Sequence, residues 1–150
     1  MTMRVLSAVP VLQIIGAYTA EDCMGGLLTF PLTGSSLPNK GARIRRLTLI
    51  DADVEKAALR LYLFNADPSA GCDTDAAAFL PVAADLLKLI GVIEVAASEY
   101  VDSTSDTAVV QEHNFPFVVA GTALYGVLVC DGTPTYTAAT DLTLKLLIED

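Results

Sequence analysis

Residues 57–64 have the sequence AALRLYLF, and this stretch decides the fold class. Leu59, Leu61 and Leu63 alternate with Arg60 and Tyr62, so every second side chain is aliphatic. Successive side chains of a β-strand point to opposite faces, and an apolar period of two is typical of a strand with one buried face. The stretch therefore predicts a half-buried strand.

The same alternation recurs at the end of the chain, in residues 141–148. Residues 43–51 alternate less regularly, because Ile44 is out of phase with Leu47 and Leu49. A β-bulge at Arg45 and Arg46 would turn all three aliphatic side chains inward.

Further strand candidates are separated by turn-forming residues. Turn signals occur at residues 34–36, 65–68 and 131–134. The additional strands are expected at residues 26–32, 89–95, 99–103, 115–119 and 123–130. About eight short strands with frequent turns predict an all-β jelly-roll or β-sandwich.

A short helical insertion is expected near residues 75–88. Asp73 or Asp75 can cap a helix over residues 76–79, and Pro81 can occupy the first turn of a second helix over residues 82–88. Residues 1–150 are expected to form one β-sandwich domain, with residues 1–20 as an N-terminal arm or first strand.

The composition argues against several classes of partner. The chain has 150 residues and a net charge of −9, and no stripe of Lys or Arg offsets that charge, so we expect no nucleic-acid partner. No apolar stretch reaches membrane-spanning length, so we expect no membrane partner. Pro10 and Gln13 interrupt the apolar run of residues 5–16, so we expect no cleaved signal peptide there.

Cysteine usage indicates a protein made in a reducing cytoplasm. Cys23, Cys72 and Cys130 are far apart and odd in number, and no CxxC pair occurs. We expect three small, mostly buried thiols.

No constellation in the sequence points to catalysis, a metal or a cofactor. His113 is the single histidine, whereas metal-binding jelly rolls converge two or three of them; we expect a polar residue at a strand edge. The acidic pairs Asp51/Asp53 and Asp73/Asp75 are explained by turn-forming and capping roles. The chain is therefore predicted to be non-enzymatic and to need no cofactor.

Two features are candidate partner interfaces. Arg43, Arg45 and Arg46 form a basic cluster in an acidic chain; it predicts either a solvated edge strand or a docking contact for carboxylates. In residues 123–130, Leu124 and Leu128 lie on one face of the expected strand. Its other face carries Tyr125, Val127 and Val129. Such a strand is either central and covered by the helical insertion, or it meets a neighbouring subunit.

The order of motifs resembles the jelly-roll head decoration (cement) proteins of tailed bacteriophages. The resemblance spans most of the chain and is best preserved in LYGVLV at residues 124–129, GTPTY at 132–136 and DLTL at 141–144. These motifs are structural, and they carry no catalytic residue.

The resemblance implies a structural virion protein on the outer capsid surface, made in the host bacterial cytoplasm. Its expected partners are the major capsid protein, whose subunits it would bridge, and further copies of itself as a homodimer or homotrimer. The alternative is a carbohydrate- or receptor-binding β-sandwich module of a phage tail. That alternative needs exposed aromatic rings, for which Tyr18, Tyr62, Tyr100 and Tyr136 are the candidates.

Overall fold

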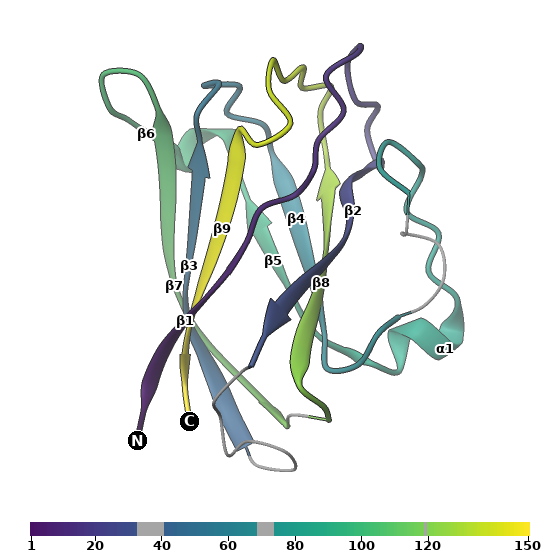
Figure 1. Cartoon of the computed structure of the whole chain (residues 1–150), viewed down its shortest axis with the longest axis vertical. Helices are drawn as coiled ribbons and strands as arrows, with labels where there is room; N and C mark the ends of the chain where they lie inside the picture. Colours follow the sequence, from purple (N-terminus) through teal and green to yellow (C-terminus); the bar gives the residue numbers. More distant parts are fainter. Residues whose placement is uncertain (33–40, 69–73, 119) are drawn as a thin grey trace.

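The computed structural model of the chain describes residues 1–32, 41–68, 74–118 and 120–150. These residues form two antiparallel sheets and almost no helix (Figure 1). The strands are β1 (Met3–Ala8), β2 (Cys23–Pro31), β3 (Gly41–Asp51), β4 (Leu59–Phe64), β5 (Leu89–Val95), β6 (Val101–Asp102), β7 (Thr107–Val118), β8 (Ala123–Cys130) and β9 (Leu142–Glu149). The helical elements are α1 (Ala83–Leu86) and the 3-10 turn η1 (Ala97–Glu99).

The strand pairing is nested, and this makes the fold a jelly roll. β1 pairs with β9, β2 with β8, β3 with β7 and β4 with β5, all antiparallel. The chain is thus one long hairpin, and rolling it up gives sheet orders β1-β9-β3-β7-β6 and β2-β8-β4-β5. The predicted all-β jelly-roll class is confirmed.

The core lies between the two sheets and uses the predicted alternation. Leu59, Leu61 and Leu63 of β4 are buried. They belong to the same core cluster as the buried residues of β9, namely Leu142, Leu144, Leu146 and Ile148. Burial of apolar surface stabilises the folded state by about 25 cal/mol per Å², so this cluster makes the main stabilising contribution.

The predicted bulge in β3 is confirmed. The register of β3 against both β7 and β9 shifts between Ile44 and Arg46. As a result Ile44, Leu47 and Leu49 are all buried, although their sequence spacing is irregular.

The helical insertion is smaller than predicted. Only α1 forms, inside the predicted range 82–88, and the backbone N–H of Val82 donates to the Asp85 carboxylate (3.2 Å). The helix predicted over residues 76–79 is wrong, because the chain there pairs with the start of β2: Cys23 N–H donates to Ala77 C=O (2.7 Å) and Phe79 N–H donates to Glu21 C=O (2.9 Å).

Asp75 does not cap a helix either. Its carboxylate oxygen accepts the Tyr18 hydroxyl (2.7 Å) and the Gly25 N–H (2.6 Å). Gly25 has φ +79°, and a Cβ at this position would collide with Pro10, so glycine is required where the N-terminal segment crosses β2. The predicted turn at residues 34–36 and the capping candidate Asp73 lie outside the described residues.

The strands predicted around β6 and β7 have different bounds in the structure. The strand expected at residues 115–119 is the end of the longer β7, and residues 99–103 comprise the end of η1 and the short β6. Within the segment expected as an arm or first strand, residues 3–8 form β1.

The expectation of three free thiols is wrong at Cys23, which is disulfide-bonded. Cys130 is free and buried, its thiol donates to Thr19 C=O (2.9 Å), and burial raises its pKa. Cys72 lies outside the described residues. None of the helices in the described part of the chain is long and apolar enough to span a membrane.

Candidate functional site

The outer face of the four-stranded sheet is largely covered by the chain itself. Val127, Val129, Phe64 and Cys23 are fully buried on this side. The half-buried residues that pack against them are Leu27, Tyr62, Phe79, Leu89 and Tyr125. The Phe79 ring lies against the Tyr62 ring, with centroids 4.4 Å apart. We call this surface the covered face.

The two faces of β8 are therefore both apolar because both are packed within one chain. Tyr125 is half-buried, and Val127 and Val129 have no exposed surface. In Figure 1 the segment with α1 lies on the side of β2 and β8, away from β3 and β7. Val127 and Val129 therefore have no surface with which to contact a partner in this structure.

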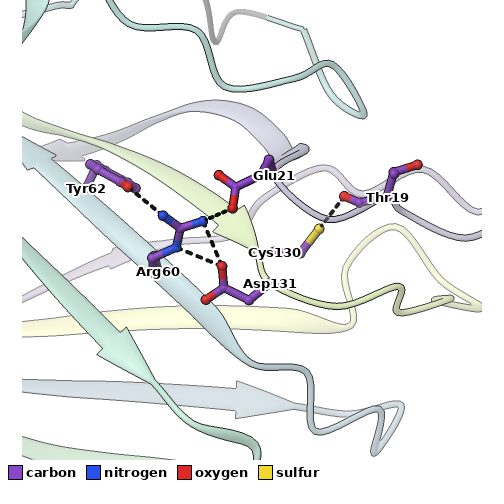
Figure 2. Close-up of polar contacts among 6 residues, drawn as sticks. All are labelled: Thr19, Glu21, Arg60, Tyr62, Cys130 and Asp131. Atoms are coloured by element: carbon purple, nitrogen blue, oxygen red, sulfur yellow. Dashed lines mark hydrogen bonds and ion pairs between the residues drawn. The ribbon is translucent and has the colours of Figure 1, made fainter.

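A charged network centred on Arg60 lies next to Tyr62 of the covered face (Figure 2). The Arg60 guanidinium of β4 bonds the Glu21 carboxylate (2.5 Å), the Asp131 carboxylate (2.8 Å) and the Tyr62 hydroxyl (2.9 Å). Only 21% of the Arg60 side chain is exposed, and these partners, Glu21 foremost, raise its pKa. Arg60 thus links the approach to β2, strand β4 and the end of β8, and the network is structural in character.

The outer face of the five-stranded sheet is open. Because alternate residues of β9 are buried, Thr143, Lys145, Leu147 and Glu149 point outward. The register places Val5 of β1 beside Leu147, Leu147 beside Arg46 of β3, and Arg46 beside Glu112 of β7. We call the outward side chains of β1, β9, β3 and β7 the open face.

Large apolar side chains on the open face are exposed to solvent. The exposed fractions are 50% for Met3, 61% for Val5, 60% for Val110 and 56% for Val118. Exposed apolar side chains grouped on one sheet face are typical of interaction surfaces.

The predicted arginine cluster lies on the open face. Arg43 (3.2 Å) and Arg45 (3.1 Å) both donate to the Asn114 side-chain oxygen. Arg45 also pairs with Glu149 (3.2 Å) and Arg46 with Glu112 (2.6 Å). Arg43 has no ion pair among the residues that the structure describes. Its guanidinium is exposed and keeps donors for an external carboxylate.

A cleft of about 550 Å³ lies at the end of the open face, next to Arg43. Pro116, Phe117 and Val118 of β7 supply its apolar wall, and Glu149 contributes a carboxylate. The cleft therefore combines an apolar surface with the Arg43 guanidinium, which is exposed and bonds Asn114 but no carboxylate of the described residues, and this combination suits insertion of a partner side chain.

The tyrosines do not form an exposed platform. Tyr18, Tyr100 and Tyr136 are buried, and burial is the first cause that raises the pKa of each. The Tyr100 hydroxyl donates to Ala57 C=O (2.7 Å). Of the four candidates, Tyr62 alone is half-exposed.

The acidic pair Asp51/Asp53 has the predicted turn-forming role. The buried Asp51 carboxylate accepts the N–H groups of Asp53 (3.0 Å) and Lys56 (2.9 Å), and Asp53 accepts the Thr137 N–H (2.9 Å). Burial, the largest effect, raises the pKa of Asp51. Within the described ranges no cluster of three or more His, Cys, Asp or Glu could hold a metal ion.

His113 lies in β7, beyond the two residues of β7 that pair with β6. In the described part of the chain, β7 therefore forms the edge of the five-stranded sheet at His113, as expected for a polar residue at a strand edge. Its ring stacks on Phe115, with centroids 5.2 Å apart, and Nε2 lies 3.1 Å from the Gln111 side-chain oxygen. Burial lowers the pKa of His113, although Glu112 and Glu99 lie nearby.

The comparisons with known proteins give distant structural likenesses only. No family model and no curated protein sequence matches the chain. CBM27-1 of Caldicellulosiruptor saccharolyticus, solved with mannohexaose, is 10% identical over 82% of this chain and 64% of that chain, with a TM-score of 0.46. Thus the match spans less than two thirds of that protein's length.

Two further solved structures are similar at the same level. The C-terminal CBM6 of LamC from Zobellia galactanivorans is 14% identical over 98% of this chain and 100% of that chain, with a TM-score of 0.38. A chain of tomato aspermy virus is 10% identical over 98% of this chain and 75% of that chain, with a TM-score of 0.40. Such scores carry no argument about a ligand, so the functional case rests on the two outer faces and the sequence.

Proposed function

We propose that this chain is a structural virion protein that binds the outer surface of a tailed-phage capsid and bridges major capsid protein subunits. The observation that carries the proposal is the open face. The chain covers one outer face with its own residues and leaves the other exposed, and this open face carries Arg43, Arg45 and Arg46 together with Val5 and Val110. The sequence resemblance supplies the class of partner.

The chemistry of the open face favours an acidic partner surface. The whole chain has a charge of −9, so an acidic shell would repel most of its surface. The arginine cluster gives the open face positive groups that such a shell can bind, and guanidinium groups form bidentate contacts with carboxylates. The adjacent valines add apolar contact that does not depend on salt.

Repetition on a shell would amplify a modest contact. A protein that binds neighbouring capsid subunits together favours the assembled shell over free subunits by mass action. Many such contacts over one shell give a large total stabilisation.

The test is co-sedimentation with expanded, empty heads of the phage that encodes the chain. Wild type should bind saturably at a fixed ratio to the capsid subunit, and decorated heads should survive a higher temperature than bare heads. The double variant Arg45→Glu/Arg46→Glu should lose at least about tenfold in affinity, since like charges would then face each other.

The matched control reverses the same number of charges elsewhere. Lys56 pairs with Asp102 (2.7 Å) and Lys88 bonds the Asp67 C=O (2.6 Å), both away from the open face. Lys56→Glu/Lys88→Glu should bind heads as wild type does. Absence of wild-type binding, or undiminished binding of the arginine double variant, would contradict the proposal.

A carbohydrate-binding module of a phage tail is the second candidate. It is favoured by the half-buried rings of Tyr62, Phe79 and Tyr125, which lie together on the covered face. A glycan array with wild type and Tyr62→Ala separates the two candidates: a glycan signal that Tyr62→Ala removes would support this function.

A further inference from the structure

One edge of the five-stranded sheet carries unpaired backbone groups. Thr2 and Asp150 exchange both backbone hydrogen bonds (2.8 and 2.9 Å). In an antiparallel pair, residues that bond the neighbouring strand alternate with residues that do not. Arg4 and Leu6 of β1 therefore bond β9, whereas the N–H and C=O groups of Met3, Val5 and Ser7 point away from it. No strand of the described residues pairs with β1 on that side.

Part of β1 lies close to β2 of the other sheet, but residues 3–8 themselves lack the sequence features that usually protect an exposed strand. Residues 3–8 contain no proline and no acidic residue, and the register with β9 runs without a bulge. The single charge, Arg4, pairs with Asp150 (3.2 Å). The outward side chains Met3 and Val5 are at least half exposed. Natural sheet edges are normally shielded by charges, prolines, bulges or a covering segment.

We propose that a second copy of this chain pairs with β1 along this edge, antiparallel and with Val5 opposite Val5 of the second copy. Met3 then lies opposite Ser7 of the second copy, and the free N–H and C=O groups of these residues all become paired. Arg4 lies opposite Leu6, so no like charges face each other. The strand is thus complementary to itself, which is the requirement for a two-fold dimer.

The pairing sets the orientation of the two open faces. An antiparallel pairing within one continuous sheet places the two-fold axis perpendicular to that sheet, so outward side chains of both copies stay on the same side. Both arginine clusters then face one way and can engage one shell together. This consequence rests on the proposed function, whereas the pairing itself does not.

The first test uses two valines of equal exposure on the same sheet. Val5→Lys places two ammonium groups opposite each other in the dimer, whereas Val110→Lys adds the same charge on β7, away from the pairing edge. The two sites are matched, because Val110 is 60% exposed and Val5 is 61% exposed. In sedimentation equilibrium, wild type and Val110→Lys should have twice the 15.8 kDa mass of one chain. For Val5→Lys, the dissociation constant of the dimer should be at least about tenfold higher than for wild type.

The second test traps the dimer. In a hydrogen-bonded antiparallel pair the two Cα atoms are about 5.5 Å apart, which suits a disulfide. Val5→Cys oxidised with diamide should give a covalent dimer on a non-reducing gel, and Val110→Cys should stay monomeric under the same treatment.

A wild-type monomer at every concentration, or equal cross-linking of the two cysteine variants, would overturn the pairing. Both tests contain no capsids, so their failure is separate from failure of head binding.

Discussion

The two outer faces of this sandwich differ in what covers them. On the covered face, Val127 and Val129 are packed under residues of the same chain; on the open face, Val5 and Val110 remain about 60% exposed. The difference shows how an apolar outward side chain should be interpreted. In β8 the apolar residues run continuously on both sides and are satisfied within the monomer. In the open face they are interspersed with arginines and remain available to partners.

The largest expected effect contrasts a buried with an exposed valine. Val127→Asp should destabilise the protein by at least about 3 kcal/mol, because it places an unpaired charge in a packed site. Val110→Asp should change the free energy of unfolding by less than about 0.5 kcal/mol. Urea denaturation measures both, and equal effects would erase the distinction between the faces.

A smaller effect is expected from uncovering the four-stranded sheet. Phe79→Ala removes the ring that packs on Tyr62 and should cost about 1–2 kcal/mol, less than a fully buried phenylalanine. Leu87→Ala, at an 88% exposed site near α1, is the control and should be nearly neutral. A neutral Phe79→Ala would mean that this ring contributes little to the cover.

Arg60 and Arg46 differ in how far their ion pairs are buried. Arg60→Gln breaks contacts to Glu21 and Asp131 and should cost about 1 kcal/mol, since its network is partly buried. Arg46→Gln breaks one exposed pair with Glu112 and should cost less than about 0.5 kcal/mol. Thermal unfolding at fixed salt should therefore show a larger loss of stability for Arg60→Gln than for Arg46→Gln. A larger loss for Arg46→Gln would assign the open-face arginines a structural role.

The smallest effect concerns pH. Burial lowers the pKa of His113 in the folded protein below its value in the unfolded chain. At a pH between these two pKa values, the unfolded chain therefore binds more protons than the folded protein does. Stability from this group is therefore complete above about pH 6.5 and declines as the pH falls through the folded value. His113→Gln should show a weaker loss of stability between pH 7 and pH 5.5 than wild type. An identical loss would assign the pH dependence to other groups.

The sequence predicted those features that depend on local alternation. The leucines of residues 57–64 and 141–148 identified two central strands, and the phase error at Ile44 located the bulge. Asp51 was assigned to a turn because a carboxylate before a loop commonly accepts nearby N–H groups.

Features that depend on distant contacts could not be predicted. An aspartate before residues 76–79 has the pattern of a helix cap, yet Asp75 bonds Tyr18 and Gly25, which are far away in the sequence. Most of β7 was missed because Gln111 and His113 occupy inward positions where the pattern requires apolar residues. The Gln111 side-chain amide donates to the Glu94 C=O and to the Glu99 carboxylate, and the His113 ring contacts the Gln111 side-chain oxygen.

The arginine cluster was located from the sequence, but the sequence could not decide between a solvated edge strand and a docking contact. The edge-strand interpretation is wrong, because β3 lies between β9 and β7 in the sheet. The role of the cluster depends on which outer face the chain itself covers. That in turn depends on where residues 76–89 pack, because Phe79 and Leu89 lie against the four-stranded sheet. Tyr125 illustrates the same point, since its exposure is set by packing with residues remote in sequence.

The nested pairing also has a consequence for folding. The entropic cost of closing a loop grows with its length. Among the four nested pairs, pairing of β4 with β5 therefore costs least, and pairing of residues 3–8 with residues 142–149 costs most. In an order governed by this cost, β1 joins the sheet last. A chain waiting at that step offers β9 to any β1 within reach, including that of a neighbour. The same short strand would then control both how fast one chain completes its sheet and how readily two chains exchange it.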